Sequence, residues 1–163
     1  MPQEPQEPAI QDLYPEHLAH CYGCGRLNEH GHHIRTFQVG EQTVSEFTPL
    51  PSHIAVPGFV YGGVIASLID CHSTATAAAA MAAASGDGAG HGAAKPPPRF
   101  VTGSLHVDYL RPTPLGEPLV VRGQAREIKG RKVIVESTVY AGGVATARGE
   151  VVAVLMPDNF GQG

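Results

Sequence analysis

The second half of the chain alternates between hydrophobic and polar side chains over four segments. A period of two residues predicts strands that bury one face. Short turns at Lys129-Gly130 and Gly142-Gly143 join the last three segments, so we expect these to pair antiparallel. The four segments are FVTGSLHVDYLRP (100–112), PLVVRGQAREI (118–128), RKVIVESTVYA (131–141) and VATARGEVVAVLM (144–156).

A long helix is predicted upstream of these strands. Residues 64–84 are rich in alanine and contain neither proline nor glycine, and a helix of about 20 residues is roughly 30 Å long. Bulky apolar residues share one face, and small or polar residues share another at three- and four-residue spacing. Large charged residues are absent all round, so we expect protein to surround this helix. The bulky face comprises Val64, Ile65, Leu68 and Ile69, and the small face comprises Ala66, Ser67, Asp70, Ser73, Thr74 and Ala77.

Two shorter alternating segments precede the helix. HHIRTFQV (32–39) and TVSEFTPL (43–50) are predicted to be strands that turn at Gly40-Glu41. The predicted order is therefore two strands, one helix and three further strands, one of them long enough to be broken in two. A single helix beside one antiparallel sheet has to be covered by that sheet. We predict an α+β fold in which a curved antiparallel sheet wraps around one long central helix.

The flanking segments are predicted to carry little structure. Residues 1–20 begin with PQEPQEP, and we expect them to bury little and to form a mobile N-terminal arm that closes with a short helical turn. Residues 21–157 form the single predicted domain. Within it, the low-complexity segment 85–99 is expected to be a flexible insertion loop. Residues 158–163 form a C-terminal tail.

Composition narrows the classes of function. The chain has 163 residues, enough for one domain, and a net charge of −4 from 15 acidic and 11 basic residues. No basic patch stands out, so we expect no nucleic-acid partner. Asp70 and His72 interrupt the longest apolar run, so we expect no membrane span. Three cysteines and an acidic, proline-rich N-terminus favour the cytoplasm over an oxidising compartment.

Asp70 is the main candidate for catalysis. A carboxylate in an apolar helix is costly unless it is paired, hydrogen-bonded or used. Gly62 and Gly63 precede the helix, where unpaired N–H groups and a partial positive charge could polarise a carbonyl oxygen. Asp70 would then be a general base or nucleophile. One alternative for Asp70 is a carboxylate that is hydrogen-bonded to Ser73, to Thr74 or to a neighbouring strand. The alternative for the glycines is a flexible helix start or close packing against a strand.

Other residues are weaker candidates for the site. His53 lies in the loop before the two glycines and could line a pocket. Thr102 begins a strand, where threonine is common in any case. Basic side chains near strand ends could hold an anionic ligand tail, although a solvated turn explains them equally well. The substrate-binding candidates are His53, Ser73, Thr74, Arg111, Arg131 and Lys132.

The cysteines raise the question of a metal. Cys21 and Cys24 form one C-x-x-C pair with histidines at loose spacing, which is a weak zinc signal because a structural site usually shows a clean second pair. The alternative is a glycine-rich turn with buried thiols. Cys71 is expected to be a buried, inert thiol. We therefore predict no metal and no cofactor.

Two motifs together resemble a known family. PGFVYGGVIASLID (57–70) is similar to the core motif of the hotdog-fold thioesterases, in which PG-x-x-HGG is followed by a helix with an acid nine residues after the histidine. FVTGSLHVDYLRPTPLGEPLVVRGQ (100–124) resembles the segment that follows this helix, and CYGCG (21–25) resembles a cysteine-rich opening. The match is to the branch that contains the phenylacetate-pathway thioesterases and the thioesterase superfamily members. It covers roughly residues 21–155.

This resemblance implies a hotdog fold and hydrolysis of acyl-CoA thioesters at sites between the subunits of a homodimer or a dimer of dimers. By position, Asp70 would be the base or nucleophile and Thr102 would orient the attacking water. The N–H groups of Gly62 and Gly63 would bind the thioester oxygen. Coenzyme A would enter only as part of the substrate.

Tyr61 departs from the family pattern. It stands where the family has histidine, and a phenol is neutral near pH 7, so it cannot supply a positive charge. One alternative is therefore a non-catalytic protein that binds acyl-CoA or another small ligand on the same fold. A hotdog-type dehydratase or hydratase is a further alternative, which ranks low because no Asp/His pair surrounds Asp70.

Overall fold

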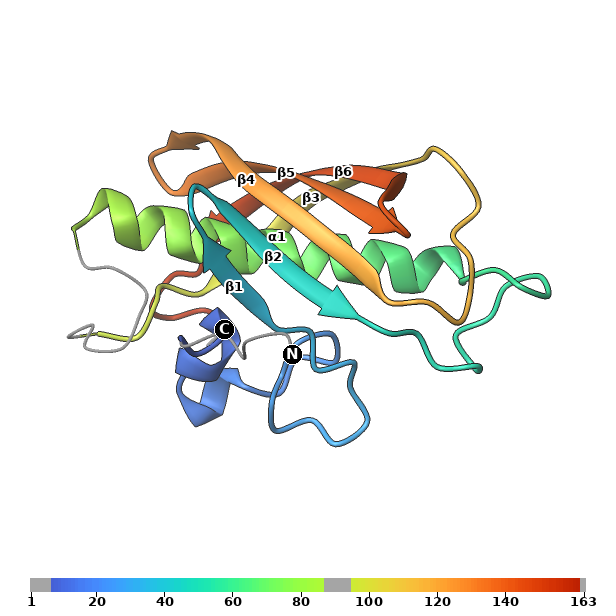
Figure 1. Ribbon diagram of the computed structural model, residues 1–163. Coiled ribbons are helices and arrows are strands. Elements are labelled where there is room, and N and C mark those ends of the chain that lie inside the picture. Colours follow the sequence, from blue (N-terminus) through green and yellow to red (C-terminus); the bar gives the residue numbers. More distant parts are fainter. Residues whose placement is uncertain (1–6, 87–94, 162–163) are drawn as a thin grey trace.

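One long helix and a six-stranded antiparallel sheet make up the fold (Figure 1). The computed structural model describes residues 7–86 and 95–161. Two short 3₁₀ helices, η1 (Ile10–Leu13) and η2 (Glu16–Leu18), lie near its start. The other elements are β1 (Thr36–Val39), β2 (Gln42–Phe47), α1 (Gly62–Ala84), β3 (Phe100–Tyr109), β4 (Leu119–Lys129), β5 (Lys132–Ala141) and β6 (Val144–Leu155). This arrangement confirms the predicted α+β hotdog class.

The strand order in the sheet is β1-β2-β4-β5-β6-β3. Four strands follow the helix where the sequence predicted three, because each alternating segment forms its own strand. The β4–β5 turn consists of Gly130 and Arg131, one residue later than predicted, since Lys129 pairs with Lys132. β3 does not pair with β4, which follows it in the chain, but with β6 at the far side. β3 is thus an edge strand of the sheet.

The core lies between α1 and the concave face of the sheet. Leu68 and Ile69 are fully buried on α1 and face inward-pointing valines of the sheet. Ile69 packs so closely against β6 that a Cβ on Gly149 would overlap its side chain. Burial of each such large apolar side chain stabilises the fold by about 1.5–3 kcal/mol. The valines are Val121, Val133, Val135, Val139 and Val151.

A buried histidine interrupts this apolar core. The two ring nitrogens of His72 form hydrogen bonds with the hydroxyls of Ser45 at 2.6 Å and Thr43 at 3.0 Å. Burial lowers the pKa of His72 to about 3, so the ring is neutral near pH 7. Both hydroxyls come from β2, so this network fixes the rotation of α1 relative to that strand.

The N-terminal segment corrects one prediction. The described part of the expected mobile arm, residues 7–20, lies against α1 and β1 instead of burying little. Ile10 and Tyr14 join the hydrophobic core, and the Gln11 side chain exchanges two hydrogen bonds with Thr36. Two buried apolar side chains hold the segment on the domain. The sequence did not reveal this contact, because the start of the segment is polar. Residues 1–6, the middle of the predicted insertion loop at 87–94 and the end of the tail at 162–163 lie outside the described residues.

The composition of α1 also bears on the expectation that no segment spans a membrane. By length and composition α1 is apolar enough to cross a membrane, with a mean hydropathy of 1.2 over its best 18-residue window. Of that window, 72% is buried inside the protein. The core helix of a folded domain meets the same criteria, so composition alone is weak support for a membrane span.

We predict that Ser45→Ala lowers the free energy of unfolding by about 1–3 kcal/mol, because it leaves a nitrogen of buried His72 without its partner. Chemical denaturation at pH 7 measures the change. Ser52→Ala, in an exposed loop, is the matched control and should have little effect. Equal stability of the two variants would contradict the role given to the His72 network.

Candidate active site

Asp70 lies on the side of α1 that faces the start of β3. Its carboxylate is half-buried and accepts a hydrogen bond from the hydroxyl of Thr102. Burial raises the pKa of Asp70, and the Thr102 hydrogen bond opposes that rise. The structure thus brings together the two side chains that the sequence placed in one site from segments 32 residues apart.

A bulge in β3 lies directly after Thr102. Thr102 pairs with Ala153 and Ser104 pairs with Val152, so Gly103 is the extra residue between them. A Cβ on Gly103 would stand 2.9 Å from a methyl group of Val154, which leaves little room for a larger residue. Bulges commonly re-aim a side chain beside a functional site. Here the bulge follows the residue that contacts Asp70.

The N-terminus of α1 offers two free donors. Among the described residues, none accepts a hydrogen bond from the N–H of Gly62 or Gly63. Tyr61 caps the helix with an extended backbone, and its side chain folds back so that a Cβ on Gly63 would overlap the ring. Tyr109 of β3 donates a hydrogen bond of 2.7 Å to the carbonyl of Gly62. The sequence motifs gave no role to Tyr109, which ties the helix start to the edge strand.

The acid and the donors are far apart within one chain. Asp70 follows Gly62 by eight residues, and a helix rises about 1.5 Å per residue, which separates them by about 12 Å along the axis. A thioester carbonyl and its attacking water span much less than this. One copy of the chain therefore does not bring the Asp70 carboxylate and the Gly62 N–H onto the same carbonyl group.

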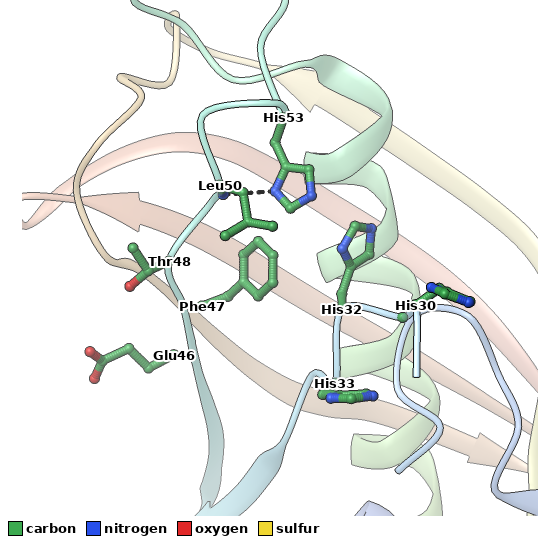
Figure 2. A pocket seen from close by; sticks show the side chains of 9 residues that line it. His30, His32, His33, Glu46, Phe47, Thr48, Leu50 and His53 are labelled. Carbon is green, nitrogen blue, oxygen red and sulfur yellow. Dashed lines mark hydrogen bonds between the residues drawn. The ribbon is translucent and has the colours of Figure 1, made fainter. Parts of the chain in front are cut away.

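His53 lies in a separate cleft of about 320 Å³, shown in Figure 2. Its ring stacks on Phe47 and meets His32 edge-on, and its Nδ1 accepts the N–H of Leu50 at 2.9 Å. Burial lowers the pKa of His32, and the nearby His53 adds to this effect. Neither Asp70 nor Gly62 lines the cleft. Its lining residues are His30, Gly31, His32, His33, Glu46, Phe47, Thr48, Leu50 and His53.

Ser73 and Thr74 do not face an open site, which corrects their prediction as substrate-binding residues. Ser73 is fully buried, and its hydroxyl pairs with that of Ser137 at 2.8 Å. Thr74 is buried too and donates to the carbonyl of Cys71 at 3.2 Å. The small-residue face of α1 is thus divided. Ser73 is covered by β5, and only the part of the face that includes Asp70 is left beside β3.

The basic candidates do not form one cluster. Lys132 begins β5 at the end of the sheet where Thr102 lies, because Lys132 pairs with Val154 and Thr102 with Ala153, and Arg131 is in the turn just before it. Arg111 follows β3 at the opposite end, and its N–H bonds to the carbonyl of Thr146. All three side chains are exposed, and Arg131 donates to the carbonyl of Leu155 at 2.8 Å. Within one chain, only the first two lie at the Thr102 end of the sheet.

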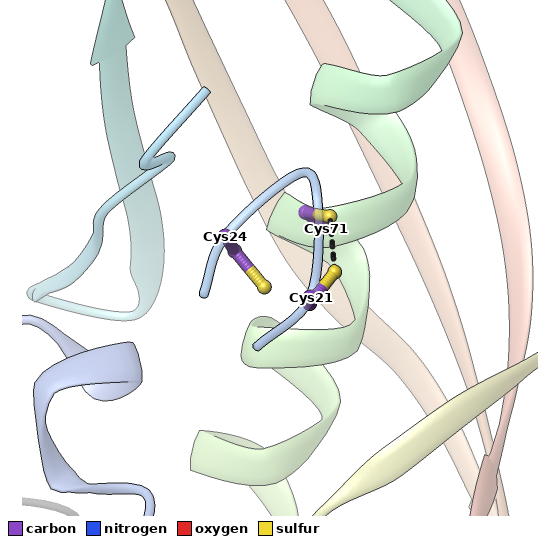
Figure 3. A group of neighbouring side chains, drawn as sticks. All are labelled: Cys21, Cys24 and Cys71. Atoms are coloured by element: carbon purple, nitrogen blue, oxygen red, sulfur yellow. Dashed lines mark hydrogen bonds between the residues drawn. The ribbon is translucent and has the colours of Figure 1, made fainter. Parts of the chain in front are cut away.

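A group of three thiols is the feature that sequence reasoning missed. Cys71 points to Cys21 and Cys24 instead of lying alone in the core, and all three sulfur atoms are within 4.8 Å of one another (Figure 3). No local pattern predicts this group, because Cys71 follows Cys24 by 47 positions along the chain. It is the place among the described residues where a metal ion could be held by several ligands.

Comparisons with known proteins identify the family of this chain. A family model described as the thioesterase superfamily matches residues 57–148, which include Gly62, Asp70 and Thr102. The acyl-coenzyme A thioesterase THEM4 of Mus musculus is 32% identical over 119 residues, covering 73% of this chain. The match covers 44% of the mouse protein, so this chain spans less than half the length of that curated relative.

Two solved structures are also similar. A thioesterase superfamily protein from Shewanella loihica is 43% identical with a TM-score of 0.63, and the match covers 88% of this chain and 100% of that one. The protein smu.793 of Streptococcus mutans, solved with acetyl CoA bound, is 16% identical with a TM-score of 0.58. That match covers 76% of this chain and 88% of the other, and at this identity it shows the fold alone.

Proposed function

Because this chain belongs to the thioesterase superfamily, we propose that it is an acyl-CoA thioesterase. The reaction adds water to an acyl-CoA thioester and releases a free carboxylic acid and coenzyme A. The observation that carries the proposal is the half-buried Asp70 carboxylate beside the hydroxyl of Thr102, at the start of the edge strand. The name of the mouse relative supports acyl-CoA as the substrate class.

Asp70 would act as general base or as nucleophile. As a base it takes a proton from a water molecule that Thr102 orients, and the resulting hydroxide attacks the thioester carbonyl. As a nucleophile it attacks the carbonyl itself and forms an anhydride, which water then hydrolyses. In both routes negative charge develops on the carbonyl oxygen and the thiolate of coenzyme A leaves. The free N–H of Gly62, with that of Gly63, would stabilise the charged oxygen at the positive end of α1.

The 12 Å gap between acid and donors is resolved if two copies of the chain share each site. We propose a homodimer, alone or as half of a dimer of dimers, in which Asp70 of one copy meets the Gly62 N–H of the other. β3 supports this arrangement, because it is an edge strand that carries exposed apolar side chains at Leu105 and Tyr109. A second copy that pairs there would cover these side chains and bring its own helix start toward Asp70.

Arg131 and Lys132 are proposed to hold the anionic part of coenzyme A. They lie at the Thr102 end of the sheet, where exposed cations can meet phosphate groups. Arg111, at the other end, is assigned no role within one chain.

A non-catalytic acyl-CoA binder is the second candidate, and the position of Tyr61 favours it. Its neutral ring stands in the family's histidine position and crowds Gly63 next to the proposed oxygen site. Turnover separates the two candidates, because a binder would be stabilised by acyl-CoA without releasing free thiol.

We expect wild type to release free coenzyme A from at least one ester in a panel of short, medium, long and aromatic acyl-CoA substrates. Asp70→Asn removes the base or nucleophile and should lower kcat by about 10²–10⁴-fold. The release of free thiol is measured for both proteins, and circular dichroism verifies their folds. No turnover with a raised melting temperature would favour the binder. Equal turnover of the two proteins would remove Asp70 from the mechanism.

A matched pair of substitutions tests the oxygen site. Gly62→Pro removes the N–H at the first position of the helix and adds a pyrrolidine ring there, which is tolerated at that position because the preceding Tyr61 is already extended. We expect it to lower kcat by about 10²–10³-fold. Gly62→Ala keeps the N–H, meets Tyr109 at no less than 3.3 Å, and should retain most activity. If both variants lose activity equally, the added side-chain volume at position 62 causes the loss, and the N–H of Gly62 has no role in catalysis.

Mixing the two inactive variants tests the shared site. In a mixed dimer of Asp70→Asn and Gly62→Pro, one of the two sites keeps both its acid and its donor. Random reassembly should therefore restore about a quarter of wild-type activity, since half the dimers are mixed and each has one intact site. A site contained within one chain predicts no recovery at all.

A further inference from the structure

The three thiols come from two distant parts of the chain. Cys21 and Cys24 lie in the tight loop between η2 and β1, and Cys71 lies on α1 directly after Asp70 (Figure 3). The sulfur atoms of Cys21 and Cys71 are 3.9 Å apart, and every pair in the group lies within 4.8 Å. Among the described residues, no histidine or carboxylate joins this group.

These sulfur–sulfur distances are close to those expected around a single bound metal ion. Zinc holds thiolate sulfur at about 2.3 Å, so two sulfur ligands at the tetrahedral angle stand about 3.8 Å apart. The Cys21–Cys71 separation agrees with this value, and the sulfur atoms of the other two pairs lie within 4.8 Å of each other. Thiolates favour soft or borderline ions over magnesium and calcium.

The loop is shaped closely around the sulfur atoms. A Cβ on Gly23 would overlap the sulfur of Cys71, and a Cβ on Gly25 would overlap the backbone at Cys21. The N–H of Gly25 bonds to the carbonyl of Cys21 at 2.7 Å. The two glycines therefore permit a tight turn that no other residue would fit, and this turn aims both loop cysteines at α1.

We propose that Cys21, Cys24 and Cys71 bind one Zn²⁺ ion as thiolates. Cys24 and Cys71 are buried and Cys21 is half-exposed, so the fourth ligand is water on the Cys21 side. The ion ties the N-terminal loop to α1 one residue beyond Asp70, and its role is to hold these two parts together. This assignment does not depend on the proposed thioesterase activity, because metal binding is measured without substrate.

The full chain, prepared under reducing conditions and loaded with Zn²⁺, should retain about one zinc per chain after removal of the excess. Competition with a chromogenic chelator gives its affinity. Cys71→Ala should weaken zinc binding by more than about 100-fold. The loss of a residue that only supports a ligand typically weakens binding by about 10–100-fold, so the larger effect indicates a direct ligand. His20→Ala, which changes an exposed neighbour of Cys21 outside the group, is the control and should leave the affinity unchanged.

A second measurement uses wild type alone, in case Cys71→Ala does not fold. Bound Zn²⁺ should slow the alkylation of Cys21, the half-exposed member of the group, which mass spectrometry measures with and without the ion, and it should raise the melting temperature. Failure of wild type to retain zinc would overturn the proposal. So would equal alkylation of Cys21 with and without zinc, or a Cys71→Ala variant that binds zinc as tightly as wild type does.

Discussion

The burial of α1 against the concave sheet is the interaction on which the rest of this structure depends. Leu68 and Ile69 are fully buried there, and the absence of a side chain at Gly149 lets Ile69 reach the backbone of β6. Close contact of this kind leaves a helix little freedom to rotate or slide, because interiors are packed as densely as organic crystals. Every polar group on α1 is therefore held at a defined place relative to the strands.

Three consecutive residues show what this constraint achieves. Successive residues of a helix point about 100° apart, so Asp70, Cys71 and His72 face three different neighbours. Asp70 meets Thr102 on the edge strand, Cys71 meets the loop cysteines, and His72 meets the hydroxyls of β2. One helical turn thus carries the proposed acid, the third ligand of the proposed zinc site and the polar centre of the core.

The same rigidity explains why the site is incomplete in one chain. A straight helix cannot bring its own first turn back to Asp70, so in the proposed dimer the N–H groups of Gly62 and Gly63 meet a substrate beside Asp70 of the second copy. The edge position of β3 makes this arrangement accessible, because among the described residues no strand pairs with the outer side of β3, which carries Thr102 and Tyr109. The distance between the Asp70 carboxylate and the Gly62 N–H is fixed because both lie on one rigid helix. In a two-fold symmetric dimer, the same contact between acid and donor is then made twice.

Local patterns in the sequence determined the elements of the fold and the residues most suited to catalysis. Alternation revealed the strands, glycines marked the turns, and the acid after two glycines marked Asp70, since each of these signals depends only on neighbours in the chain. Tertiary structure alone decided that β3 lies beside β6, that residues 7–20 join the core, that Ser73 is covered by β5 and that Cys71 meets the C-x-x-C loop. The physical reason is that α1 is apolar on nearly every side, so its sequence specifies a buried helix without specifying which face each partner takes. Those partners are fixed by contacts between residues far apart in the chain, which no local period encodes.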